Sequence, residues 1–324
     1  MSEEIIHNPH DKLFKEAFSR CEMAVDFFKN YLPTAVSARL DWESLHLEPG
    51  SFTDEALRGS ESDLLYTVQI DKHPALLYCL FEHQSSPDAW MPLRLLRYIL
   101  GIWDQFRKQT PEATKLPPIL PIILYQGGDT WTCDASLSSL IDIPDGLAIY
   151  QPVFQHLLVD LNQVESENIK GAPSLRTILL ALKASRKHTN KDLELLIRLL
   201  AAIIHNDHAL IRTVMLYLYK VDNTTDINEY IHKAEALNQP ELQEEIMTIA
   251  ETLRTEGKIE GKIEGKQEAL QEDILEILEL RFQSVSYSIK KQLEEISDTA
   301  VLRQLLRLAV QAESIEAFQK AMPN

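Results

Sequence analysis

The sequence predicts an α/β protein: a mixed sheet flanked by helices, followed by an all-helical C-terminal region. Strand signals lie in the first half of the chain, where turn residues separate the apolar runs, and they fade beyond about residue 165. Amphipathic helical spacing opens the chain and dominates the part after residue 165. We therefore expect an N-terminal domain over 1–165, a helical domain over 166–250, and a third part over 251–324 that contains a repeat helix and further helices.

The first predicted elements are a helix over 10–31 and a strand over 40–52. Apolar residues between Leu13 and Phe28 fall close to helical spacing, and Pro33 stops the run. In 40–52 apolar and polar residues alternate up to a Pro-Gly turn, which is typical of a strand with one buried face.

A hairpin, a helix and two further strands complete the predicted N-terminal domain. The hairpin pairs 62–70 with 75–84, and the amphipathic segment 91–106 has the length of a helix. The apolar runs 119–125 and 154–161 read as buried strands. The expected order is thus helix, three strands, helix and two strands.

Helical patterns fill the rest of the chain. Within them EGKIEGKIEGK (256–266) repeats every four residues, which places its glycines in one stripe on a helix. Each glycine costs about 1 kcal/mol relative to alanine in a helix interior. Two interpretations remain open: a solvated helix or linker, or a glycine stripe that lets a partner helix approach. The helical segments are 174–186, 190–220, 226–236, 239–282, 287–297 and 299–321.

Composition limits the possible functions. The chain has 324 residues and a net charge of −17, so contact with nucleic acid needs a local basic patch or a divalent metal. It has no apolar run long enough for a membrane span and no apolar leader, so we expect a cytoplasmic protein without a membrane partner. Three widely spaced cysteines form neither a disulfide framework nor a zinc pattern.

Acidic and amide residues stand where the predicted hairpin ends. If its loop is Lys72-His73, Asp63 lies directly opposite Glu82, and Gln84 points to the same face. Two opposed carboxylates repel each other. A hard cation such as Mg²⁺ would explain them, because it binds oxygen ligands and retains water molecules. Such an ion activates a bound water for phosphodiester cleavage.

These residues and their order resemble the PD-(D/E)XK nuclease superfamily, which has a restriction-endonuclease-like core of the order α-β-β-β-α-β. The chain is most similar to the recombination-promoting nucleases, also called YhgA-like putative transposases. That resemblance rests on HDKLFKEAF (10–18), SDLLY (62–66), LFEHQSS (80–86), LRLLRY (93–98), LPPILPIILYQGGDTW (116–131) and the EGK repeat.

The resemblance implies a Mg²⁺-dependent DNA endonuclease of low sequence specificity that is linked to DNA recombination. Asp63 and Glu82 would bind the metal ion, and Gln84 stands where the superfamily pattern has lysine. An amide can orient the attacking water only through hydrogen bonds. Asp11 on the first helix would be an auxiliary acid, with Glu16 as the alternative.

Basic side chains are the candidates for contact with the DNA backbone. Two lie on the 91–106 helix, and four belong to the densest basic group in this acidic chain. They are Arg94, Arg97, Arg176, Lys183, Arg186 and Lys187.

A second reading assigns no catalysis to the chain. The net charge and the missing lysine favour a nuclease fold that serves as a binding or regulatory module through helical self-association. In either reading we expect a homo-oligomer, most simply a dimer, assembled through the C-terminal helices.

Overall fold

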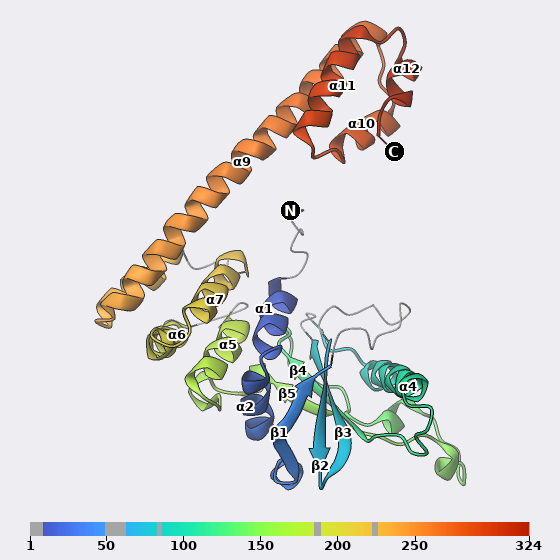
Figure 1. Ribbon diagram of the computed structural model, residues 1–324, viewed down its shortest axis with the longest axis vertical. Coiled ribbons are helices and arrows are strands. Elements are labelled where there is room, and N and C mark those ends of the chain that lie inside the picture. The colour runs from blue at the N-terminus through green and yellow to red at the C-terminus, as the bar shows by residue number, and fades with distance from the viewer. Residues whose placement is uncertain (1–8, 49–62, 83–85, 185–188, 222–225, 324) are drawn as a thin grey trace. The chain divides into compact units, whose positions relative to one another are not determined.

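The computed structural model describes residues 9–48, 63–82, 86–184, 189–221 and 226–323 (Figure 1). The chain divides into two compact units, Met1–Met247 and Thr248–Asn324. Among the described helices, none is both long enough and apolar enough to cross a bilayer.

The first unit contains a five-stranded mixed sheet with the order β1-β2-β3-β4-β5. β1, β2 and β3 pair antiparallel, whereas β3, β4 and β5 pair parallel. This mixed sheet with flanking helices confirms the expected α/β class. The strands are β1 (Leu40–Leu47), β2 (Asp63–Ile70), β3 (His73–Glu82), β4 (Ile119–Tyr125) and β5 (Leu157–Asp160).

The turn of the β2–β3 hairpin lies one residue earlier than predicted. Asp71 and Lys72 have φ values of 49° and 66°, and two positive φ angles are what a tight type I′ turn requires. Asp63 therefore pairs with Leu80, so the prediction that it lies directly opposite Glu82 is wrong. The shift along β3 is two residues, which keeps positions 63 and 82 on the same face of the sheet.

The predicted helix 10–31 is two helices, α1 (Pro9–Phe18) and α2 (Cys21–Tyr31). Arg20 has an extended backbone, with φ −82° and ψ 115°, which ends the first helix and redirects the chain. The break lets both helices bury aromatic side chains on the same face of the sheet. Full burial of one such side chain contributes about 1.5–3 kcal/mol.

The two faces of the sheet are covered differently. On the α1 and α2 side, Phe18 and Phe28 are fully buried, and Phe28 packs edge-on against Tyr66 with ring centroids 5.3 Å apart. The other face lies under α4 (Met91–Gln109), and Tyr78 and Trp131 belong to that core. The short helix α3 (Thr34–Ser37) joins α2 to the sheet.

More helices complete the first unit, and α5 and α7 pack against α1. The predicted helix 190–220 is divided between α6 and α7, because the Asp207 carboxylate accepts a hydrogen bond from the Leu210 backbone N–H and so caps a new helix. The helices are α5 (Pro173–Ala184), α6 (Asn190–Ile203), α7 (His208–Val221) and α8 (Ile227–Ala236). Short 3₁₀ helices are η3 (Leu137–Leu140), η4 (Ala148–Tyr150), η5 (Leu161–Gln163) and η6 (Ser166–Asn168).

The second unit has its own apolar core, which includes Ile274, Leu278, Leu293, Leu302 and Phe318. The EGK repeat lies inside one continuous helix, and a methyl group placed on any of its three glycines would meet no atom within 4 Å. Within this chain the repeat is therefore a solvated stretch of helix. The helices are α9 (Pro240–Phe282), which begins in the first unit, α10 (Tyr287–Glu294), α11 (Thr299–Gln311) and α12 (Ile315–Lys320).

Candidate functional site

Three strands have an acidic terminal residue along one edge of the sheet. β2 begins at Asp63, and the parallel strands β3, β4 and β5 end at Glu82, Tyr125 and Asp160. Because β2 runs antiparallel to β3, its first residue lies beside the end of β3. Along this edge Glu82 pairs with Tyr125, which in turn pairs with Asp160.

The carboxylate of Asp63 is held by a tyrosine on the neighbouring strand. Tyr78 is buried and donates its hydroxyl hydrogen to Asp63 Oδ2. Burial and the adjacent Asp63 charge raise the pKa of Tyr78 well above its usual value. The phenol therefore remains protonated at neutral pH and keeps its role as donor. The sequence pattern did not single out Tyr78, which reads as a core residue of an apolar strand.

Asp160 was also missed, although an acid that directly follows a buried apolar run is a signal that could have identified it. Its carboxylate is buried and accepts hydrogen bonds from Trp131 N at 3.3 Å, Asn162 N at 2.9 Å and Gln163 Nε2 at 3.2 Å. These bonds fix the turn after β5. We assign Asp160 to supporting the edge rather than to binding a ligand.

Asp11, the predicted auxiliary acid, is buried in the first turn of α1. The alternative, Glu16, is exposed on the same helix and accepts a hydrogen bond from Thr213 Oγ1 at 2.6 Å. The side chains of Glu82 and Gln84 lie outside the described part of the chain. In that described part, no three His, Cys, Asp or Glu side chains group closely enough to hold a metal ion.

The basic residues predicted to contact DNA occupy different environments. Arg94 is half-buried on α4 and pairs with Asp88 at 3.3 Å, whereas Arg97 is exposed. Arg176 is half-buried, and the half-buried Lys183 donates from Nζ to the Val164 carbonyl oxygen. Arg186 and Lys187 lie outside the described residues.

A buried histidine lies beside the core under α4. His156 is 4% exposed, and its ring packs edge-on against Trp131 at a centroid distance of 6.4 Å. Neither ring nitrogen has a hydrogen-bond partner among the described residues. Burial lowers the pKa of His156 to about 4, so the ring is neutral at pH 7.

Comparisons with known proteins relate the chain to one family. The family "Putative transposase, YhgA-like" matches residues 8–213. The Escherichia coli K12 protein "Inactive recombination-promoting nuclease-like protein RpnE" is 31% identical over 79% of this chain and 85% of its own length. "Recombination-promoting nuclease RpnA" from the same organism is 28% identical over 80% and 87%, respectively.

A third relative is more similar over a shorter region. "Recombination-promoting nuclease RpnC" of Escherichia coli K12 is 41% identical over 38% of this chain and 40% of its own length. No solved structure matches the chain.

Proposed function

The chain belongs to the family of YhgA-like putative transposases, and from that premise we propose that it is a nuclease that cleaves DNA and is linked to recombination. Relatives named as recombination-promoting nucleases support this activity. One structural observation carries the proposal. Asp63, held by Tyr78, stands at the sheet edge where β3 ends at Glu82.

The order of the elements supports a PD-(D/E)XK core. A helix, three antiparallel strands, the helix α4 and the parallel strand β4 follow one another, as that core requires. Asp63 then takes the place of the acid on the second strand, and Glu82 takes that of the acid on the third.

We propose Asp63 and Glu82 as ligands of Mg²⁺, because carboxylate oxygens suit a hard cation. When bound, such an ion would lower the pKa of a water molecule and offset charge on the phosphate. The hydrogen bond from Tyr78 orients the Asp63 carboxylate before any ligand arrives. Gln84 would orient the water through its amide, and Asp11 would act as the auxiliary acid.

The proposed substrate is DNA of many sequences, and the proposed location is the cytoplasm. Direct reading of bases needs a helix or ribbon with specific side chains in a groove. The candidate contacts Arg94 and Arg97 on α4 and Arg176 on α5 are arginines, which suit phosphate. We therefore expect cleavage with low sequence specificity.

The test is cleavage of supercoiled plasmid by the purified chain with Mg²⁺, and again with the chelator EDTA. Asp63→Asn and Glu82→Gln should each lower cleavage by more than about 100-fold, beyond the range for loss of an outer-shell partner. Glu43→Gln and Asp142→Asn change exposed acids elsewhere and serve as matched controls. Full activity in both site variants would show that Asp63 and Glu82 do not form the catalytic site.

One observation favours a second candidate function. The relative RpnE, 31% identical over most of both chains, is named as inactive. If this chain is also inactive, it would have a nuclease fold that serves as a binding or regulatory module and does not cleave DNA. The plasmid assay separates the two functions, because such a module shows no cleavage with any divalent metal.

We also propose that the chain forms a homodimer through its C-terminal helices. The glycine stripe of the EGK repeat is exposed within the chain, and small residues allow close approach of a second helix. Gly261→Leu should then halve the mass measured by light scattering, whereas Gly261→Ala should preserve the dimer. A monomeric wild-type protein would contradict this proposal.

A further inference from the structure

A groove runs between α1 and α7 in the first unit. It has a volume of about 340 Å³, and the residues that line it follow one stripe on each helix. On α1 these residues repeat at helical spacing from Pro9 to Glu16, and on α7 they repeat from Ala209 to Lys220. The floor is mainly apolar.

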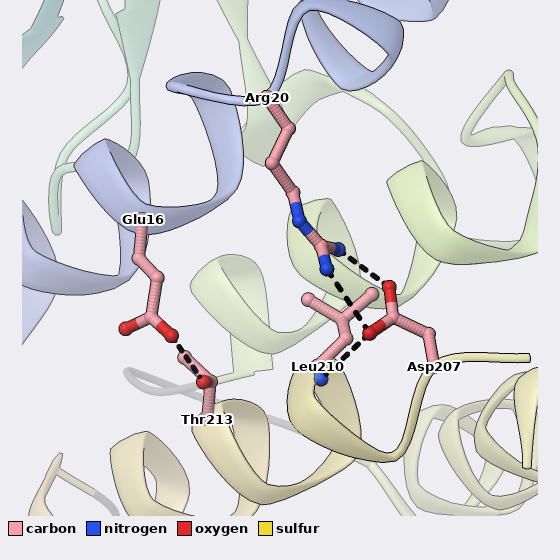
Figure 2. A network of polar contacts seen from close by, with 5 residues as sticks. All are labelled: Glu16, Arg20, Asp207, Leu210 and Thr213. Atoms are coloured by element: carbon pink, nitrogen blue, oxygen red, sulfur yellow. Dashed lines mark hydrogen bonds and ion pairs between the residues drawn. The ribbon is translucent and has the colours of Figure 1, made fainter.

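Polar contacts hold the two helices on either side of this groove. His10 Nδ1 and the Tyr217 hydroxyl are 2.8 Å apart near the start of α1. Figure 2 shows the other two contacts: Glu16 accepts from Thr213, and Arg20 bridges to Asp207. In these three contacts the residue numbers rise along α1 as they fall along α7, so the two helices are antiparallel. Because the contacts lie within the chain, the groove is present before any ligand binds.

The Arg20–Asp207 contact is the ion pair among the three. Arg20 Nη1 lies 2.5 Å from Asp207 Oδ2, and Nη2 lies 3.1 Å from Oδ1, which makes a bidentate ion pair. The same carboxylate accepts from Leu210 N at 3.0 Å and fixes the first turn of α7 (Figure 2).

Three exposed cations line the groove. Lys12, Arg212 and Lys220 are exposed, and none of them forms an ion pair or a side-chain hydrogen bond within the described part of the chain. Among the described residues that line the groove, Glu16 is the one acid, and it is hydrogen-bonded to Thr213. In a chain with a net charge of −17 this is a local excess of positive charge.

We infer that the α1–α7 groove binds the phosphate backbone of DNA. This inference rests on the proposed function, because it assigns a binding surface to the same substrate. An acidic chain needs a local basic surface to hold nucleic acid. Lys183, from the basic group expected to provide one, is instead used inside the fold.

The spacing of the cations suits several phosphates on one strand. Arg212 and Lys220 are eight residues apart, which is about 12 Å along a helix. Phosphates on one strand of B-DNA follow one another at about 3.4 Å along the axis. The apolar floor at Leu13 and Leu216 offers a contact surface for sugars. Lys12 directly follows Asp11, so the same turn of α1 carries the groove on one side and the candidate auxiliary acid on the other.

The test measures binding of a fluorescent duplex oligonucleotide by anisotropy over a range of salt concentrations, with EDTA present so that no cleavage occurs. Each phosphate contact contributes about 0.9 to the slope of log K against log salt. The triple variant Lys12→Glu, Arg212→Glu, Lys220→Glu should lower the magnitude of that slope by about 2–3. The variant Lys108→Glu, Lys115→Glu, Lys320→Glu changes the net charge equally at other exposed sites and should keep the wild-type slope.

A second variant changes binding in the opposite direction. Glu16→Gln removes the negative charge from the groove and keeps an acceptor for Thr213, so it should tighten DNA binding several-fold. A folding defect cannot produce tighter binding, which keeps the test valid if the triple variant fails to fold. Unchanged DNA binding by Glu16→Gln would overturn the inference.

An unchanged slope in a folded triple variant would also overturn it. A groove that instead accepts an acidic protein helix would leave DNA binding unchanged and would bind a synthetic acidic amphipathic peptide only with its cations intact. Failure of the proposed function is a separate result: the wild type would not cleave plasmid with Mg²⁺, yet it would bind DNA with a slope that depends on the groove.

Discussion

Both faces of the sheet bury tyrosines, and the hydroxyl groups of Tyr66 and Tyr78, one from each face, have different kinds of partner. On the α1 and α2 side, Tyr66 donates to the backbone carbonyl of Phe18 at 2.6 Å. On the α4 side, Tyr78 donates to the Asp63 carboxylate. The first bond ties a helix end to the sheet, whereas the second positions a charged group at the sheet edge.

We therefore expect the Tyr66 hydroxyl to contribute to folding stability and the Tyr78 hydroxyl to contribute to catalysis. A hydroxyl bonded to a backbone carbonyl satisfies a buried polar group and contributes to folding. A hydroxyl bonded to a carboxylate orients a possible metal ligand. The α4 side also contains the buried His156, whose pKa is lowered by burial, so we expect this face to lose stability in mild acid.

The largest expected effect is a loss of folding stability at low pH that depends on His156. The pKa of His156 falls from 6.5 in the unfolded chain to about 4 in the folded protein, so the unfolded state binds more protons between these values. Stability should therefore fall as pH drops from 6.5 towards 4, by about 3 kcal/mol in total. Urea unfolding of wild type and His156→Leu at pH 7 and pH 5 measures this loss.

His156→Leu should remove that part of the pH dependence, because leucine does not titrate. Tyr66→Phe, on the opposite face, should retain it. An equal pH dependence in wild type and His156→Leu would show that the α4 side does not respond in this way.

The next effect is on catalysis. Tyr78→Phe removes the hydrogen bond that orients Asp63 and should lower plasmid cleavage about 10-fold, at the low end for loss of an outer-shell partner. DNA binding in EDTA should not change. A variant that cleaves at the wild-type rate would mean that this bond has no role in the reaction.

The matching change on the other face should affect stability alone. Tyr66→Phe removes the donor to the Phe18 carbonyl and should lower the free energy of unfolding by about 1 kcal/mol. Cleavage per folded molecule should stay at the wild-type level. The comparison of the two faces fails if Tyr66→Phe reduces cleavage as much as Tyr78→Phe does.

The smallest effect concerns the anchor beside the groove. Arg20→Ala breaks a partly exposed ion pair with Asp207 and should cost about 0.5 kcal/mol at pH 7. The Arg20 hydrogen bond lowers the pKa of Asp207, so this contribution exists at neutral pH and is lost as pH falls below the usual carboxyl range. Thermal melts at pH 7 and pH 3 should therefore show a larger difference between wild type and variant at pH 7.

Strand positions were predictable because their signals are local. The run 119–125 is a strand in the structure with the same bounds, and the apolar runs of β3 and β5 each end in an acid, Glu82 and Asp160. The hairpin turn was misplaced because Asp71 and Lys72 adopt positive φ, which Asp and Lys do not signal as clearly as glycine. The shared face of positions 63 and 82 was still predicted correctly, since side chains alternate with a period of two.

By itself the sequence determined the α/β class, the apolar faces of the strands and the acids at their ends, because alternation along a strand or helix depends only on near neighbours. Only the tertiary structure decided the break at Arg20, the hydroxyl bonded to Asp63 and the groove lined by exposed cations. These depend on contacts between distant residues, such as His10 and Tyr217, which are 207 positions apart. Local periodicity carries no information about which distant helices will pack together.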